Sequence, residues 1–269
     1  FMFLPFILGF WYSLTDYTGL SGDYDFVGLK NYADLFQDRY FRVSIRNNII
    51  YAVLYSVLTL LVSLLLATLL NRLTKLRKLF RTVFFLPYIS SMVSVAIIWK
   101  MIFNPSGGPL NTILEQIGIS DPPKWLASTD WALYAVVIVS VWKFCGYYML
   151  IFLAGMQNIP DSLYESAALD GAGVLQRYFR ITIPVLTPTI FLNMILITIS
   201  SFQVFDLINV MTQGGPGMST NVLAYRIYYE GFQHSHMGYA SAIAYFLFAI
   251  ILVITLIQFA MQKYWVNYD

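Results

Sequence analysis

Long apolar stretches divide this sequence into segments of membrane-spanning length. A helix needs about 20 mainly apolar residues to cross roughly 30 Å of hydrocarbon, where its backbone groups must bond to one another because water is absent. Five stretches meet this requirement and are predicted as complete spans: Ile49 to Leu70, Thr82 to Phe103, Trp131 to Met156, Val185 to Met211 and Tyr239 to Gln262. Phe1 to Leu14 is apolar but shorter, and we predict that it ends a truncated first helix. The pattern predicts an all-α polytopic membrane protein with six spans.

Two connections between the predicted spans have helical patterns of their own. In Asn31 to Asn48 apolar residues recur at three- and four-residue spacing among charges, which predicts a helix lying at the outer membrane interface. The longer link from Asn158 to Pro184 predicts two short helices, broken at Gly171 and stopped by Pro184. Gly171 is suited to the left-handed conformation that ends many helices.

Composition excludes the soluble classes. Apolar residues make up 58% of the chain and charged residues 11%, whereas a soluble domain is about half apolar and about a quarter charged. The 16 Lys and Arg against 14 Asp and Glu give a net charge of only +2, which argues against nucleic acid as the main partner. The single Cys145 allows no internal disulfide, and no Cys/His group has the spacing of a zinc site.

Lysine and arginine in the connections predict the orientation, because short loops rich in these residues stay in the cytoplasm. The link from Arg72 to Arg81 holds five cations and no acid. That side also receives Asn158 to Pro184 and the C-terminal tail, for eight cations against four acids, while the opposite connections hold six cations against nine acids. Both termini are therefore predicted to be cytoplasmic.

The link from Asn158 to Pro184 contains the most specific motif. It reads Glu165-Ser166-Ala167, two spacers, Asp170-Gly171-Ala172, and then Ile181-Thr182-Ile183-Pro184 after a gap. This resembles the EAA loop of binding-protein-dependent ABC importer permeases, whose pattern is Glu-Ala-Ala, two spacers, Asp-Gly-Ala, and later Ile-x-Leu-Pro. Ser166 replaces the first Ala and Ile183 replaces the Leu, and both changes preserve size and polarity closely enough for docking.

The resemblance implies a role for this loop. In the family it is the coupling helix that inserts into a cleft of the ATP-binding subunit. By that resemblance the coupling contacts are these six residues: Glu165, Ser166, Ala167, Asp170, Gly171 and Ala172. Residues 1–269 would then form one permease domain of the type I ABC importer fold, with 158–184 as its cytoplasmic coupling loop.

Three further segments resemble the carbohydrate-type permeases, the MalF- and UgpA-like members that import sugars or glycerol-phosphate compounds. They are Phe26 to Tyr32, Phe80 to Pro87, and Phe202 to Asp206 with Thr212 to Gly217. The family implies a second, related permease subunit, two ATP-binding subunits and an external substrate-binding protein, in the cytoplasmic membrane of a bacterium or archaeon. No Gly-x-x-x-x-Gly-Lys-Ser/Thr motif occurs here, so ATP and Mg²⁺ are expected on the partners and this chain is expected to be no enzyme.

Polar residues inside the spans are the candidates for the substrate pathway, since intramembrane charge is costly. Lys143, beside Trp142 and Tyr147, suits a sugar site, or it pairs with a carboxylate or extends to the interface and only stabilises the bundle. Gln203, Asp206 and Asn209 share one helical stripe that either lines a cavity or braces the end of its span.

The glycine-rich outer connection leaves two interpretations open. The segment Gly214-Gly215-Pro216 either contacts the binding protein or simply reverses the chain. At the level of the whole protein, the alternatives are an ABC permease for amino acids, peptides or metals, and an ion-driven secondary transporter. The second predicts inverted repeats and leaves the loop motif unexplained. An intramembrane enzyme is disfavoured, because the spans contain no catalytic cluster.

Overall fold

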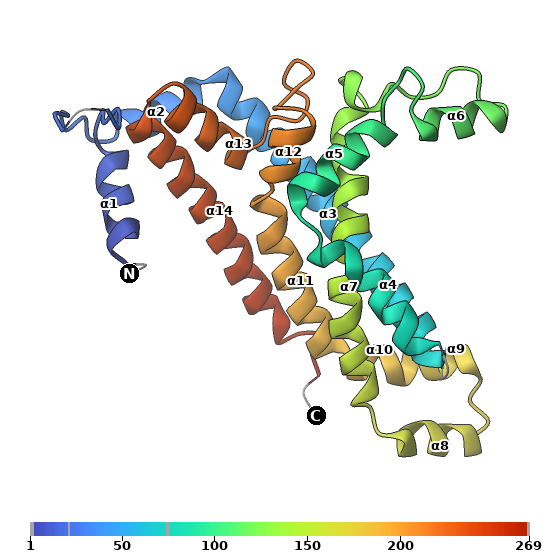
Figure 1. Ribbon diagram of the computed structural model, residues 1–269. Helices are drawn as coiled ribbons and strands as arrows, with labels where there is room; N and C mark the ends of the chain where they lie inside the picture. The colour runs from blue at the N-terminus through green and yellow to red at the C-terminus, as the bar shows by residue number, and fades with distance from the viewer. Residues whose placement is uncertain (1–2, 21, 74–75, 268–269) are drawn as a thin grey trace. The chain divides into compact units, whose positions relative to one another are not determined.

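The computed structural model describes residues 3–20, 22–73 and 76–267. Within these residues the chain is helical and contains no β-strand; one isolated antiparallel bridge joins Thr15 to Phe26. Figure 1 shows the order of the helices. The α-helices are α1 (Phe3–Ser13), α2 (Lys30–Gln37), α3 (Arg39–Arg72), α4 (Arg77–Ile89), α5 (Met92–Ile102), α6 (Pro109–Gln116), α7 (Ala132–Gln157), α8 (Asp161–Leu169), α9 (Val174–Arg177), α10 (Ile183–Val185), α11 (Thr187–Phe202), α12 (Asp206–Met211), α13 (Leu223–Tyr228) and α14 (Met237–Gln262). Three further turns are the 3₁₀ helix η1 (Trp125–Ala127) and the π-helical segments η2 (Tyr178–Thr182) and η3 (Tyr229–Gln233).

The chain divides into two compact units. Unit 1 comprises Phe1–Leu54, Ser91–Val139 and Ser200–Val253, and unit 2 comprises Tyr55–Ser90, Ser140–Ile199 and Ile254–Asp269. Four long helices, α3, α7, α11 and α14, contribute residues to both units. The candidate sites described below each lie within one unit.

Four segments of the described chain are long and apolar enough to cross a membrane: α3, α7, Thr187–Met211 and α14. They confirm four of the five complete spans that the hydropathy pattern predicts. A fifth is counted if α4 and α5 together form one broken span. Helix α1 is apolar but only 11 residues long, so the count of six spans remains a prediction.

The prediction of one helix from Thr82 to Phe103 is wrong. The chain leaves the helical conformation at Ser90 and Ser91, which are both extended, with ψ of 147° and 133°. Pro87 lies inside α4, three residues before the break, and its missing N–H removes a helical bond on its N-terminal side. The predicted helix is therefore two helices, bent by 96° at the break.

The single helix predicted for Asn31 to Asn48 is wrong in its extent: the structure forms a separate helix over the first part only. Helix α2 ends at Gln37, and α3 begins at Arg39, ten residues before the predicted start of the span. Asp38 caps α3, because its Oδ1 accepts a hydrogen bond of 2.7 Å from the Tyr40 N–H. Residues 39–48 are therefore the first turns of the long helix.

Close helix packing organises unit 2. Its core contains Ala67 and Leu70 of α3, Phe152 and Met156 of α7, and Leu186. Two glycines of α7 permit this packing: a methyl group at Gly146 would collide with the backbone of Phe84 in α4, and one at Gly155 would collide with Thr189 of α11. Small residues at such crossings let membrane helices approach closely.

Candidate functional site

Helix α8 in unit 2 ends in a compact hydrogen-bonded motif. Gly171 has φ of +80°, the left-handed conformation that the sequence predicts for it. The N–H of Gly171 bonds to the carbonyl of Ala168 at 3.1 Å, and the N–H of Ala172 bonds to the carbonyl of Ala167 at 2.9 Å. This pair of bonds is a Schellman motif, which satisfies carbonyls that the helix end would otherwise leave free. The conformational prediction at Gly171 is confirmed.

The surface of α8 is unusually open. None of its nine residues is buried, and the Leu169 side chain is 90% exposed. Among the predicted coupling residues, Glu165, Ser166, Asp170 and Gly171 are exposed, and Ala167 and Ala172 are partly buried. An exposed leucine on a short helix of small residues is a typical contact surface for a protein partner.

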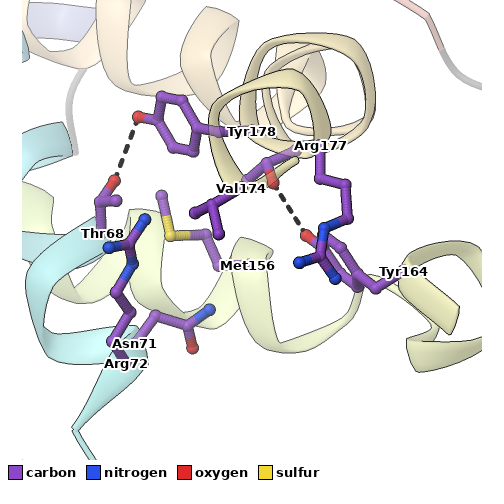
Figure 2. A pocket seen from close by; sticks show the side chains of 9 residues that line it. Thr68, Asn71, Arg72, Met156, Tyr164, Val174, Arg177 and Tyr178 are labelled. Atoms are coloured by element: carbon purple, nitrogen blue, oxygen red, sulfur yellow. Dashed lines mark hydrogen bonds between the residues drawn. The ribbon is translucent and has the colours of Figure 1, made fainter. Parts of the chain in front are cut away.

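Two hydrogen bonds fix the return of the loop: one braces the loop internally, and the other ties it to α3. The Tyr164 hydroxyl of α8 lies 3.0 Å from the Thr182 hydroxyl of η2, and the Tyr178 hydroxyl of η2 lies 3.1 Å from the Thr68 hydroxyl of α3 (Figure 2). The short helix α9 runs directly into π-helical η2, so these contacts belong to one continuous element. The loop is thus connected through side chains to the end of α3.

A cavity of about 160 Å³ lies among these contacts. In the view of Figure 2, Arg72 and Arg177 approach it from opposite sides, with Met156 and Val174 between them. Within the described part of the chain, neither guanidinium has an ion-pair partner. Thr68, Asn71, Tyr164, Tyr178 and Thr182 complete the lining. The cavity therefore has a positive charge beside the coupling loop.

The side chain of Lys143, in α7, caps the C-terminal end of α4 by hydrogen bonding to its carbonyls. Its side chain is 2% exposed, and its Nζ donates to the carbonyl oxygens of Pro87 at 2.8 Å, Ser90 at 2.7 Å and Tyr88 at 3.4 Å. These carbonyls belong to the end of the helix, where four backbone acceptors lack a helical partner. The bonds go neither to a carboxylate nor to the interface, the two structural alternatives that the sequence suggests.

Of the two aromatic residues predicted beside Lys143, Tyr147 is packed against α4 and Trp142 is exposed. Tyr147 stacks on Tyr88 with ring centroids 4.6 Å apart and planes inclined by 12°, and Tyr88 also packs against Phe144. Trp142 is largely exposed on the same helix. Lys143 and Tyr147 thus meet at the end of α4, and whether either contacts substrate is still a prediction.

The predicted polar stripe in unit 1 is interrupted. Gln203 lies in the break between α11 and α12, and Asp206 is the first residue of α12. Both are exposed, and Asn209 is partly buried. Because the helix is not continuous from Gln203 to Asp206, spacing in the sequence does not by itself place these side chains on one face.

The turn formed by residues 213–217, called here the Gly-Pro turn, follows α12. Gln213, Gly214 and Gly217 have φ of 51°, 79° and 60°, so the chain reverses through left-handed conformations. The segment that follows is anchored to α3, because Asn47 Nδ2 donates to the carbonyls of Met218 at 2.7 Å and Asn221 at 3.0 Å. The predicted role of Gly214, Gly215 and Pro216 as a contact for the binding protein stays a prediction.

Unit 1 also contains a charge network that the sequence pattern does not reveal. Arg226 of α13 pairs with Asp38 at 3.3 Å and with Glu230 at 2.7 Å. Asp38 also accepts a hydrogen bond of 2.9 Å from the Tyr239 hydroxyl, and Glu230 is 2.9 Å from His236 Nδ1. In the sequence, only the i,i+4 spacing of Arg226 and Glu230 indicates an ion pair, because Asp38 lies 188 residues before Arg226.

These features define a polytopic α-helical membrane protein with an exposed, anchored helical loop. Residues 42–265 match the family described as "Binding-protein-dependent transport system inner membrane component", and the chain belongs to this family. It is therefore an integral membrane transport subunit and no enzyme, as the sequence predicts. The family has no cofactor in the chain itself, and no group of three or more His, Cys, Asp or Glu in the described residues is arranged to hold a metal ion.

Named relatives and solved structures agree with this assignment. The chain is 37% identical over 266 residues to the probable ABC transporter permease protein YurN of Bacillus subtilis, covering 98% of this chain and 91% of that protein. It is 35% identical over 264 residues to the sn-glycerol-3-phosphate transport system permease protein UgpA of Yersinia pestis, covering 96% and 88%. A chain of the bacterial alginate ABC transporter, solved with an alginate pentasaccharide-bound periplasmic protein, has a TM-score of 0.85 and 27% identity, covering 98% and 88%. The predicted permease fold is confirmed.

Proposed function

We propose that this chain is the permease subunit of an ATP-driven importer for carbohydrates or glycerol-phosphate-type compounds. It forms half of the translocation pathway with a second, related permease subunit. Two ATP-binding subunits hold ATP and Mg²⁺, and an extracytoplasmic binding protein delivers the substrate. The named substrates of relatives, glycerol 3-phosphate and alginate, support this class. The three carbohydrate-type sequence segments support the same class.

One observation carries the proposal: α8 is an exposed helix on a loop that is tied to α3. Glu165 and Leu169 lie on a helix without buried residues, so an ATP-binding subunit can cover them without unfolding the loop. The Schellman motif at Gly171 fixes the end of α8. A rigid helix can transmit displacement, whereas a flexible loop would absorb it.

The contacts of this loop suggest how coupling works. When the ATP-binding subunits close on ATP, they move α8 as a unit. The pairs Tyr164–Thr182 and Tyr178–Thr68 then carry the displacement from α8 through η2 to the end of α3. Since α3 is a 34-residue helix, a tilt at this end changes the access to the pathway from one side of the membrane.

The remaining assignments complete the proposal. Lys143, Trp142 and Tyr147 form one part of the substrate pathway, and Gln203, Asp206 and Asn209 form another. Gly214, Gly215 and Pro216 contact the binding protein. Residues 1–269 form one permease domain whose termini and loop 158–184 are cytoplasmic, as the excess of Lys and Arg in those connections indicates.

The test is ATPase activity of the assembled importer in lipid, with neutral sugars, acidic oligosaccharides and glycerol phosphates presented by the binding protein. We expect one substrate class to stimulate ATP hydrolysis and uptake together. Glu165→Ala should reduce the stimulation, and Glu115→Ala, at an exposed glutamate of α6, should leave it unchanged. Uptake that follows an ion gradient without ATP would contradict the proposal.

A further inference from the structure

A second cavity, of about 350 Å³, lies in unit 1 between the Gly-Pro turn and the charge network of Arg226. We call it the Arg226 cavity. Its lining combines aromatic, amide and charged side chains. Six of these are Tyr40, Gln213, Asn221, Arg226, Tyr229 and Glu230. Its volume is near the lower end of the range of about 300–1,000 Å³ that is typical of small-molecule sites. The size suits a single small ring rather than an extended chain.

Arg226 is the central group of this cavity. Its side chain is 6% exposed, and its Nε has no hydrogen-bond partner within the part of the chain that the structure describes. That nitrogen is itself shielded from the cavity, and both ion pairs of Arg226 are made by Nη2. Nη1 therefore has no hydrogen-bond partner among the described residues, and it is the donor that a ligand in the cavity can meet. The guanidinium itself is held in place, because its Cζ lies 4.9 Å from the Tyr40 ring centroid and 5.5 Å from that of Tyr229.

The charge balance selects the kind of acceptor. Arg226 already faces two carboxylates, Asp38 and Glu230, so these three side chains have a net charge of −1 when the imidazole of His236, which lies against Glu230, is neutral. An anionic ligand would meet this excess of negative charge at short range. A hydroxyl group meets no such penalty, since it accepts from the guanidinium and donates to a carboxylate. The network therefore favours a neutral, polyhydroxylated ligand.

The other lining groups fit the same ligand. The Oδ1 of Asn221 is occupied by the Ser44 hydroxyl at 2.8 Å, which leaves the Nδ2 donor for a ligand. Gln213 is exposed at the cavity and supplies a second amide. Tyrosine faces offer apolar surface to C–H groups, while amides and charged groups bond hydroxyls. This combination matches the alternating apolar and polar surface of a sugar ring.

We propose that the Arg226 cavity is a subsite for one neutral sugar ring, separate from the pathway residues around Lys143. The proposal rests on the carbohydrate function proposed above. It concerns this cavity alone, where a uronate or phosphate group would meet two carboxylates, and it leaves anionic substrates to the rest of the pathway.

Binding to the paired permease subunits in lipid nanodiscs tests this subsite. Saturation-transfer-difference NMR would use maltotriose as the neutral probe, with glycerol 3-phosphate and a uronic acid trisaccharide as anionic probes. We expect a signal from maltotriose and none above background from the anions. Gln213→Asn should weaken maltotriose binding about fivefold, the effect of losing one hydrogen bond to a neutral group.

The variants are chosen so that failure to fold does not explain the result. Asparagine tolerates the left-handed φ of 51° at position 213 and keeps the amide while shortening its reach. Gln233→Asn is the matched control, since Gln233 is exposed and does not line the cavity. Glu230→Gln, which removes a carboxylate partner, should weaken maltotriose binding more than Gln213→Asn does.

Three results would overturn the subsite. One is equal maltotriose binding by Gln213→Asn and Gln233→Asn, and another is binding of an anionic probe at least as strong as that of maltotriose. The third is a loss of affinity for the binding protein in Gln213→Asn with sugar binding unchanged, which would make the cavity a protein contact. ATP-coupled uptake is measured separately, so loss of coupling contradicts the proposed function without changing the binding result.

Discussion

The coupling loop (residues 158–184) and the Lys143 joint at the end of α4 both terminate helices of unit 2, by opposite means. At the loop, α8 closes its last carbonyls with its own backbone and leaves every side chain outside the core. At the Lys143 joint, three backbone carbonyls depend on one buried side chain of another helix. The end of α8 satisfies its carbonyls with local backbone N–H groups, whereas the end of α4 needs a side chain from α7.

This difference separates a surface that is free to meet a partner from a side chain that stabilises the fold, whether or not Lys143 also contacts substrate. A self-capped helix can expose Leu169 and Glu165 to another subunit at no cost to its own structure. A buried lysine beside a helix end satisfies acceptors that would otherwise remain desolvated, and each such group costs about 1–3 kcal/mol when left unpaired. Substitutions should therefore affect association at the loop and stability at the joint.

The largest effect is expected for Lys143→Met. The variant leaves the carbonyls of Pro87, Tyr88 and Ser90 without their donor, and it should lower the free energy of unfolding by about 3 kcal/mol or more. Thermal denaturation in detergent measures the loss. Lys263→Met, at an exposed lysine in the same unit, is the control. Equal melting temperatures for the two variants would show that the joint does not depend on this side chain.

Asn47→Ala extends the comparison to unit 1. Asn47 donates two hydrogen bonds to the segment after the Gly-Pro turn, and it is 8% exposed. Its loss should cost about 2 kcal/mol, since one buried and one partly buried carbonyl lose their donor. The same substitution at exposed Asn158, at the start of the loop, should stay within about 0.5 kcal/mol. A larger loss of stability in Asn158→Ala than in Asn47→Ala would contradict the distinction between the exposed loop and the buried hydrogen bonds.

Gly171→Ala should have a smaller and local effect. No atom lies within 4 Å of an added methyl group, so the cost of about 1 kcal/mol comes from the φ of +80°. Hydrogen exchange should show faster opening at the end of α8 with an unchanged global melting temperature. Gly173→Ala is the control, because Gly173 has equal space and an ordinary φ of −68°. Identical exchange in both variants would contradict the Schellman account.

The sequence predicts features whose physical cause is local. Apolar runs of sufficient length identify α3, α7, α11 and α14, and Gly171 identifies the end of α8. The start of α3 was readable as well, since Asp38 is a typical N-cap residue, but the charges of residues 31–48 indicated an interface helix instead. Local patterns give helices and caps with their ends uncertain by several residues.

Features that depend on distant partners were not predictable. Lys143 bonds to carbonyls 53 to 56 residues earlier, and Asn47 bonds to Asn221 across 174 residues. Single-sequence periodicity carries no information on such pairs. For the same reason, the composition of the Arg226 cavity emerges only when α3, the Gly-Pro turn and η3 are seen together. Intramembrane charge marked Lys143 as unusual without revealing its three acceptors.

The most direct test of the central claim uses Leu169→Asp in the coupling loop. Leu169 is 90% exposed, so the charge should leave the melting temperature of the chain unchanged. Affinity for the ATP-binding subunits should fall at least about tenfold, because a charge then faces an apolar contact. Ile117→Asp, at a 70% exposed position after α6, is the control and should retain both stability and assembly. Normal assembly and substrate-stimulated ATP hydrolysis in Leu169→Asp would contradict the assignment of α8 as the surface that couples this permease to its ATPase.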